Sequence, residues 1–125
     1  MVRPSRELLA VVEEYFANGP SGAASWRARY VEPDTALRVI GTDDTEWLAG
    51  PDAYAVLADE SAHVDTEVPV SLREVEAFES GDVGWVAARP EVSMPDGTSL
   101  SLRWSAVFEK ARGSWTLRQV HVSRG

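Results

Sequence analysis

The hydrophobic period of this chain changes once, near residue 66, and that change decides its fold class. Apolar residues before this point recur at the spacing of a helix, and those after it alternate as in a strand. Helices followed by a run of strands predict an α+β layout, in which the helices cover one face of the sheet. We therefore expect a cone-shaped, curved antiparallel sheet of four to six strands, wrapped by three helices from the N-terminal half.

Capping and breaking residues place the three helices. The first is expected to begin after the N-cap Ser5 and to end at Gly19–Pro20, and the second covers 22–31. The third begins at Pro51, because proline suits the first position of a helix, and runs to about residue 62. A short strand over 37–41 separates the last two helices.

Turn signals divide the second half into long strands. Turns are expected at Ser80–Asp82, Met94–Gly97 and Arg112–Gly113, where glycine accepts a positive φ. A change of face near Arg73–Glu74 predicts a β-bulge. The strand 83–92 is apolar on both sides, which indicates a central strand that needs cover on each face.

Composition narrows the classes of function. The 125 residues suffice for one domain, which we place over 1–125. A net charge of −8 argues against a nucleic-acid partner, because phosphate binding needs clustered cations. We expect no membrane association, since the sequence shows neither a spanning apolar run nor a secretory signal. Cysteine is absent, which excludes disulfides, thiolate metal sites and a cysteine nucleophile, and favours a cytoplasmic location.

No cofactor and no metal are expected. Asp43, Asp44 and Glu46 bring carboxylates together, but their spacing differs from that of a calcium-binding loop, and turn formation explains them. His63 lies near the end of an acidic helix, where it is expected to offset the helix dipole. The sequence shows no glycine-rich phosphate loop and no nucleotide-binding fingerprint.

Aromatic residues are the candidates for a ligand site. The sequence holds five tryptophans, in five different predicted elements. Trp85 and Trp115 are expected in the core, whereas Trp26, Trp47 and Trp104, with Tyr30, are predicted to line a pocket for an apolar or aromatic ligand.

His121 is the candidate catalytic residue. Counting by twos from Trp115 places Leu117, Gln119 and His121 on one face of the last strand. If that face is concave, the imidazole can exchange a proton near neutral pH, and Gln119 can orient a carbonyl group or a water. The alternative is a histidine at a strand end that packs at a dimer interface or meets solvent.

Three stretches follow a pattern typical of one family. They are a short strand with an acidic turn before a helix, the opening of the central strand, and the last strand. In the sequence these are Leu37–Thr42 with Trp47, Gly50 and Asp52–Ala53, then Gly81–Ala87, and finally Gly113–Leu117 continuing to His121–Ser123. In this order they resemble the SnoaL-like branch of the nuclear transport factor 2-like superfamily, over nearly the whole chain.

The resemblance implies a cone-shaped α+β barrel, a homodimer formed through the sheet, and a pocket between the helices and the concave face. It does not imply one function, because members include isomerases, cyclases, dehydratases, epoxide hydrolases and non-catalytic binding modules. Isomerase-like members place a carboxylate base where Val39 stands here, and Tyr15, which could match their phenol, lies in an apolar stripe. Epoxide-hydrolase members need an Asp–Arg–Asp cluster, whereas Arg89, Glu91 and Arg103 are expected to pair across strands.

Two hypotheses follow. The first is a protein that binds a small hydrophobic molecule and, if it is an enzyme, catalyses cyclisation, isomerisation or dehydration by acid–base chemistry without a cofactor. The second is a non-catalytic dimerising or ligand-binding module whose cavity is incidental.

Overall fold

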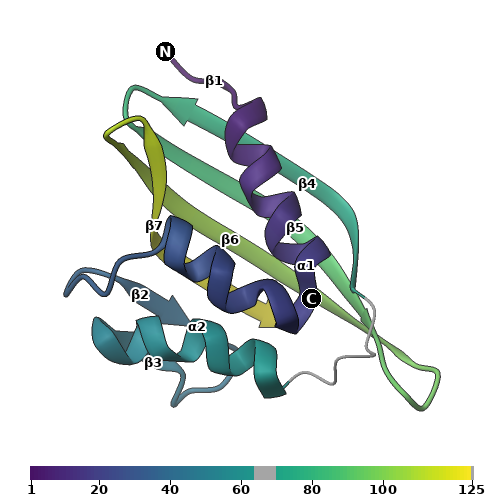
Figure 1. Cartoon of the computed structure of the whole chain (residues 1–125). Coiled ribbons are helices and arrows are strands. Elements are labelled where there is room, and N and C mark those ends of the chain that lie inside the picture. Colours follow the sequence, from purple (N-terminus) through teal and green to yellow (C-terminus); the bar gives the residue numbers. More distant parts are fainter. Residues whose placement is uncertain (64–69, 125) are drawn as a thin grey trace.

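Helices lie along one side of a curved sheet that does not close into a barrel (Figure 1). The structure is a computed structural model that describes residues 1–63 and 70–124, and within these ranges all side chains except those of 18–21 and 58–63. The elements are β1 (Arg3–Pro4), α1 (Arg6–Tyr30), β2 (Arg38–Ile40), β3 (Trp47–Ala49), α2 (Pro51–His63), β4 (Val70–Ser80), β5 (Val83–Ser93), β6 (Ser99–Ala111) and β7 (Ser114–Arg124).

The strands form one sheet in the order β1-β4-β5-β6-β7-β2-β3. Neighbouring strands are antiparallel except β2 and β7, which run parallel. The expected fold class is confirmed, but the sheet is mixed and has seven strands rather than four to six. The difference comes from its edges, where the two-residue β1 and the three-residue β3 each add a strand that hydrophobic alternation is too short to indicate.

Helix α1 folds back on itself. Its helical backbone continues from Arg6 to Tyr30, yet the indole nitrogen of Trp26 donates to the carbonyl oxygen of Val11 at 2.9 Å. In a straight helix these residues would be about 22 Å apart along the axis, so the two halves must lie side by side. Figure 1 shows this change of direction. The break predicted at Gly19–Pro20 is therefore a sharp bend within one assigned helix, as expected where proline removes a hydrogen bond.

The inner face of the sheet, which we define as the face toward the helices, carries the core. Trp26, Phe108 and Trp115 are its largest fully buried side chains. Gly84 leaves room for this packing, since a Cβ atom there would lie 2.6 Å from Leu8 Cδ2 and 3.0 Å from Trp115 Cζ3. The packing of Leu8 and Trp115 over β5 at this point thus depends on a residue without a side chain.

The predicted bulge and turns in the second half are confirmed. The register of β4 against β5 shifts between Leu72 and Val75, which places the bulge at Arg73–Glu74. Gly97, Arg112 and Gly113 adopt positive φ in the two later turns. Among the described residues, no helix is long and apolar enough to cross a membrane.

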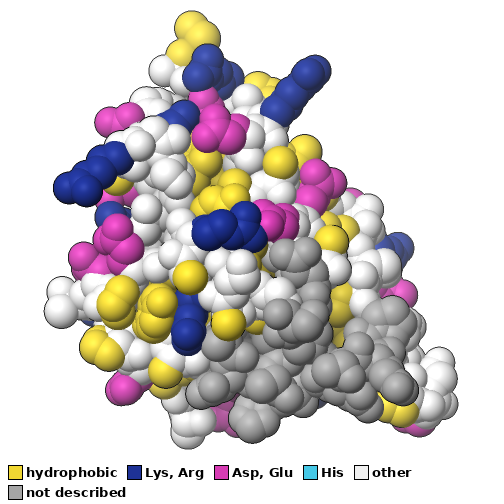
Figure 2. Space-filling view, viewed as in Figure 1, with side chains coloured by type: hydrophobic (Ala, Val, Ile, Leu, Met, Phe, Trp, Pro, Cys, Tyr) yellow, Lys and Arg dark blue, Asp and Glu magenta, His cyan; other side chains and the backbone are white. Residues whose placement is uncertain are grey.

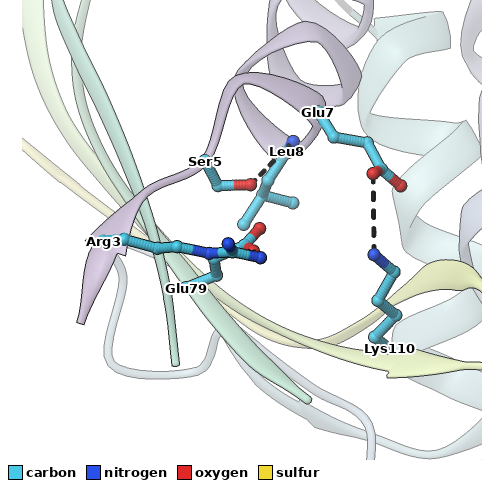
Figure 3. Close-up of polar contacts among 6 residues, drawn as sticks. All are labelled: Arg3, Ser5, Glu7, Leu8, Glu79 and Lys110. Carbon is cyan, nitrogen blue, oxygen red and sulfur yellow. Dashed lines mark hydrogen bonds and ion pairs between the residues drawn. The ribbon is translucent and has the colours of Figure 1, made fainter. Parts of the chain in front are cut away.

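A polar anchor ties the N-terminal segment to β4 (Figure 3). The Ser5 hydroxyl accepts from the backbone N–H of Leu8 at 3.2 Å and caps α1. Glu79, which is 8% exposed, accepts from Nε and Nη2 of Arg3 at 2.8 and 2.5 Å. A hydrogen bond from Ser5, followed by the Arg3 guanidinium, lowers the pKa of Glu79 below its usual range. One carboxylate therefore holds both the first strand and the start of α1.

The Glu79 anchor predicts an acid-sensitive contribution to stability. Since the folded pKa lies below the unfolded value of about 4.3, this contribution is complete above that pH and is lost as the pH falls through the folded value. In urea unfolding from pH 7 to pH 3, Glu79→Gln should lower stability at pH 7 and flatten the acid dependence. Glu13→Gln, at an exposed carboxylate of α1, is the control. An unchanged acid slope in Glu79→Gln would contradict this assignment.

Candidate functional site

The hollow between the helices and the inner face is almost filled. Its remaining cavity has a volume of about 10 Å³. Ligand pockets usually measure about 300–1,000 Å³, so this cavity has room for about one water molecule. The lining residues come from α1, α2 and three strands: Tyr15, Trp26, Val39, Ile40, Leu57, Trp104, Leu117, Val120 and Val122.

A cluster of aromatic rings occupies the hollow. The ring of Tyr15 lies 4.7 Å from that of Trp26 and 5.9 Å from that of Trp104, measured between centroids. Phe16 packs edge-on against Trp104 at 5.2 Å. The fold-back of α1 brings Trp26 to Tyr15, and the hydrogen bond of Trp26 to Val11 fixes its indole. These rings lie at the distances of stable aromatic pairs and pack as a core does.

None of the described side chains that line this cavity carries a charge. Its polar side-chain atoms are the Tyr15 hydroxyl and two indole nitrogens, and the nitrogen of Trp26 already donates to Val11. General acid–base catalysis needs a group that exchanges a proton near the working pH. Among these residues, the cavity contains no carboxylate or imidazole for that task.

The structure separates the predicted aromatic ligand-site residues. Trp26 and Trp104 line the cavity and are 1% and 5% exposed. Tyr30 contacts the ring of Trp26 at 5.3 Å, but it lines a different groove outside the hollow. Trp47 lies at the edge strand β3 and is 67% exposed. The expectation that Tyr30 and Trp47 line the same hollow as Trp26 is therefore wrong.

Gln119 and His121 do not lie on the concave face, which was the condition for their predicted roles, because β7 contains a bulge. Phe108 pairs with Leu117, whereas its neighbour Val107 pairs with Gln119, so Arg118 is an extra residue. Leu117 is buried before the bulge, while Gln119 and His121 are exposed after it. Both side chains belong to the outer face, which we define as the face away from the helices. On the helix side, Figure 2 shows no histidine among the coloured side chains.

The sequence contained a signal for this bulge, because the apolar residues Val120 and Val122 fall one residue out of phase with Trp115 and Leu117. In the structure Val120 is buried and Val122 lines the cavity, so both face inward. Alternation counted from the two valines would have placed His121 outward. The predicted contact of His63 with the helix dipole lies outside the described side chains.

The acidic loop before β3 forms a turn. The Asp43 carboxylate accepts from the backbone N–H of Thr45 at 2.9 Å and from its hydroxyl at 2.8 Å, and both bonds lower its pKa. The Glu46 carboxylate accepts from the backbone N–H of Asp43 at 3.2 Å. These contacts are those of an Asx turn.

A second concavity of about 350 Å³ lies between α1 and the β6–β7 turn. Two carboxylates of α1 border it, and a cation already pairs with each: Lys110 with Glu7 at 3.5 Å, and Arg29 with Glu14. The four charges cancel. We therefore find no electrostatic preference for a ligand in this groove.

The outer face of the sheet has an apolar patch on its long strands, toward the β4–β5 turn. Phe78, Trp85 and Val107 are cross-strand neighbours there, and the first two rings lie 6.3 Å apart. Val83 and Val107 are 45% and 38% exposed. Trp85, which was expected in the core, is half-buried on this face. No described segment of the chain covers this surface.

Comparison with solved structures shows which proteins share this fold. The fold is shared with a nuclear transport factor 2-like (NTF2-like) protein of unknown function from Pseudomonas putida: TM-score 0.74, 13% identity, 97% of this chain and 89% of that chain covered. An NTF2-like protein from Streptomyces avermitilis, proposed to be a dehydratase, gives a TM-score of 0.76 at 15% identity, covering 95% and 94%. The CaMKII hub of S. rosetta gives 0.76 at 18% identity, covering 98% of each chain.

Residues 24–124 match the SnoaL-like domain family, and the chain belongs to that family. No curated protein matches the sequence. The similar structures share less than a fifth of their residues with this chain, so they establish the fold and not an activity. The predicted resemblance to the SnoaL-like branch of the superfamily is confirmed.

Because the hollow is filled, we predict that Trp104 contributes more than Trp47 to the free energy of unfolding. Trp104→Ala should lower the free energy of unfolding by about 3–5 kcal/mol, because it removes a buried ring from the aromatic cluster. Trp47→Ala removes the same kind of side chain from an exposed position, so it should lower the free energy of unfolding by less than about 1 kcal/mol. Urea unfolding at one protein concentration measures both. Equal losses in the two variants would contradict the described packing.

Proposed function

We propose that this protein is an assembly module, a SnoaL-like domain that forms a homodimer through the outer face of its sheet. The observation that carries the proposal is the exposure of Val83, at the start of β5, and of Val107 on β6, which lie in one apolar patch with Phe78 and Trp85. Contiguous apolar surface on a soluble protein is typical of an interaction site. Gln119 and His121 lie on this face, in agreement with the alternative that the histidine packs at a dimer interface.

Two further observations support an assembly role over catalysis. The described lining of the hollow is uncharged, and its cavity is about 10 Å³, which leaves no room for a substrate without movement of the rings. One protein of the same fold is a hub domain, and that similarity is compatible with self-association. In this proposal the conical hollow serves as a hydrophobic core.

The proposal also takes residues 1–125 as one domain and places the protein in the cytoplasm. The continuous sheet, which joins β1 at one edge to β3 at the other, supports a single unit. The absence of cysteine from the sequence supports a reducing compartment.

Self-association predicts a dimer at micromolar concentration in sedimentation equilibrium. Val107→Asp should shift the protein to monomers without a change in its circular dichroism spectrum, because it places a charge at the centre of the interface. Met94→Asp, at an exposed hydrophobic residue of the β5–β6 turn, is the matched control and should remain dimeric. A monomeric wild-type protein would contradict the proposal.

A second candidate function is binding of a small apolar or aromatic molecule between Trp26 and Trp104. The observation that favours it is the aromatic and aliphatic lining of the inner cavity. Because the cavity is small, such a ligand has to displace at least one ring, and its binding energy must exceed the packing that is lost.

Thermal unfolding with a panel of small aromatic compounds tests this second function. A ligand that binds the folded state raises the melting temperature in proportion to the logarithm of its concentration. Such a compound should also change tryptophan fluorescence, since Trp26 and Trp104 line the cavity. A panel that leaves both signals unchanged would exclude the ligand-binding candidate and leave the dimer proposal in place.

A further inference from the structure

We infer that two copies pack outer face to outer face in one orientation, set by Glu76 of each copy pairing with Arg103 of the other. This inference rests on the proposed dimer and specifies how its two subunits recognise each other. Both residues lie on the outer face, beside its apolar patch.

The outer face is large enough for a stable dimer. It is built mainly from β4 to β7, strands of 11 to 13 residues each. With a spacing of about 4.8 Å between strands and a rise of about 3.3 Å per residue, these four strands span roughly 700 Å². A standard interface buries about 800 Å² on each partner, so a second copy of this chain matches the available area.

Most charges on this face are already paired within the chain. Arg118 contacts Glu109 at 3.0 Å, Arg73 contacts Glu91 at 3.5 Å and Arg89 contacts Glu74 at 3.6 Å. Glu76 and Arg103 form no ion pair with any residue that the structure describes. Arg103 donates to the carbonyl oxygen of Arg124 at 3.2 Å, which orients its guanidinium without neutralising it. Among the described residues of β4 to β7, this face therefore keeps one acid and one base without an ion pair, whereas Arg38 of β2, which also forms no ion pair, lies farther out toward the sheet edge.

These two residues lie on the two strands that flank β5. Glu76 of β4 pairs across the sheet with Ala87 of β5, which in turn pairs with Ser105 of β6. Arg103 is on β6, one inward–outward repeat from Ser105, and both are exposed. Two strand spacings and one repeat separate Glu76 from Arg103 by about 12 Å, which is too far for a salt bridge within one copy.

A twofold axis between two copies can bring Glu76 of each copy opposite Arg103 of the other. When the axis lies in the plane between two facing sheets and is the perpendicular bisector of the line from Glu76 to Arg103, each acid faces the partner's base. The interface then contains two equivalent ion pairs beside apolar contacts among Val107, Trp85 and Ala87. An isologous interface requires such self-complementarity. Its charges select the orientation more than they add affinity.

Reciprocal charge reversal tests the inference. Glu76→Arg gives a chain with two bases at these positions, and Arg103→Glu gives a chain with two acids. Each variant alone should dimerise at least about tenfold more weakly than the wild type, because like charges face each other twice. An equimolar mixture should form heterodimers, since each Arg then faces a Glu. Sedimentation of the separate and mixed samples, with one chain fluorescently labelled, measures this.

Controls separate this inference from the proposed function. Glu13→Arg reverses an exposed charge on α1 and should dimerise like the wild type. If a reversal variant fails to fold, Glu76→Gln and Arg103→Gln should each weaken the dimer about threefold or more. A monomeric wild type overturns the proposed dimer itself. A wild-type dimer that tolerates both reversals, or reversal variants that do not combine when mixed, overturns the pairing of Glu76 with Arg103 and leaves the dimer intact.

Discussion

The extra residue in β7 at Arg118 decides which side chains face the helices and which face away. Before the bulge, Trp115 and Leu117 point inward; after it, Val120 and Val122 take that position. A one-residue shift in a strand exchanges its two faces. The bulge therefore supplies the hollow with aliphatic walls and moves His121 to the outer surface. An uninterrupted strand would have placed an imidazole among the aromatic rings.

The folding back of α1 has the complementary effect on the hollow. It places Trp26 against Tyr15, whose ring also packs near Trp104, so that aromatic rings fill the space that a curved sheet and its helices enclose. Burial of these rings stabilises the fold, and it leaves a cavity of about 10 Å³. Packing and ligand binding compete for the same volume. In this chain the packed arrangement predominates, whereas the outer face retains exposed apolar side chains.

Much of the fold could be predicted from the sequence, because its signals are local. Pro51 marks the start of α2, the change of face at Arg73–Glu74 marks the first bulge, and Gly113 marks the last turn. The sites were predicted less well. Strict alternation placed His121 on the same face as Trp115 and Leu117, and one inserted residue reverses that placement. The exposure of Trp47 depends on its location at a sheet edge, which a three-residue strand does not reveal.

The central claim is that this protein acts through the outer face of its sheet, as a pair of chains. Small-angle X-ray scattering measures that assembly directly, because the radius of gyration depends on the number of subunits. Two compact subunits of 125 residues predict a value of about 18 Å at micromolar concentration. A concentration-independent value of about 14 Å, that of one compact chain of this length, would contradict the account.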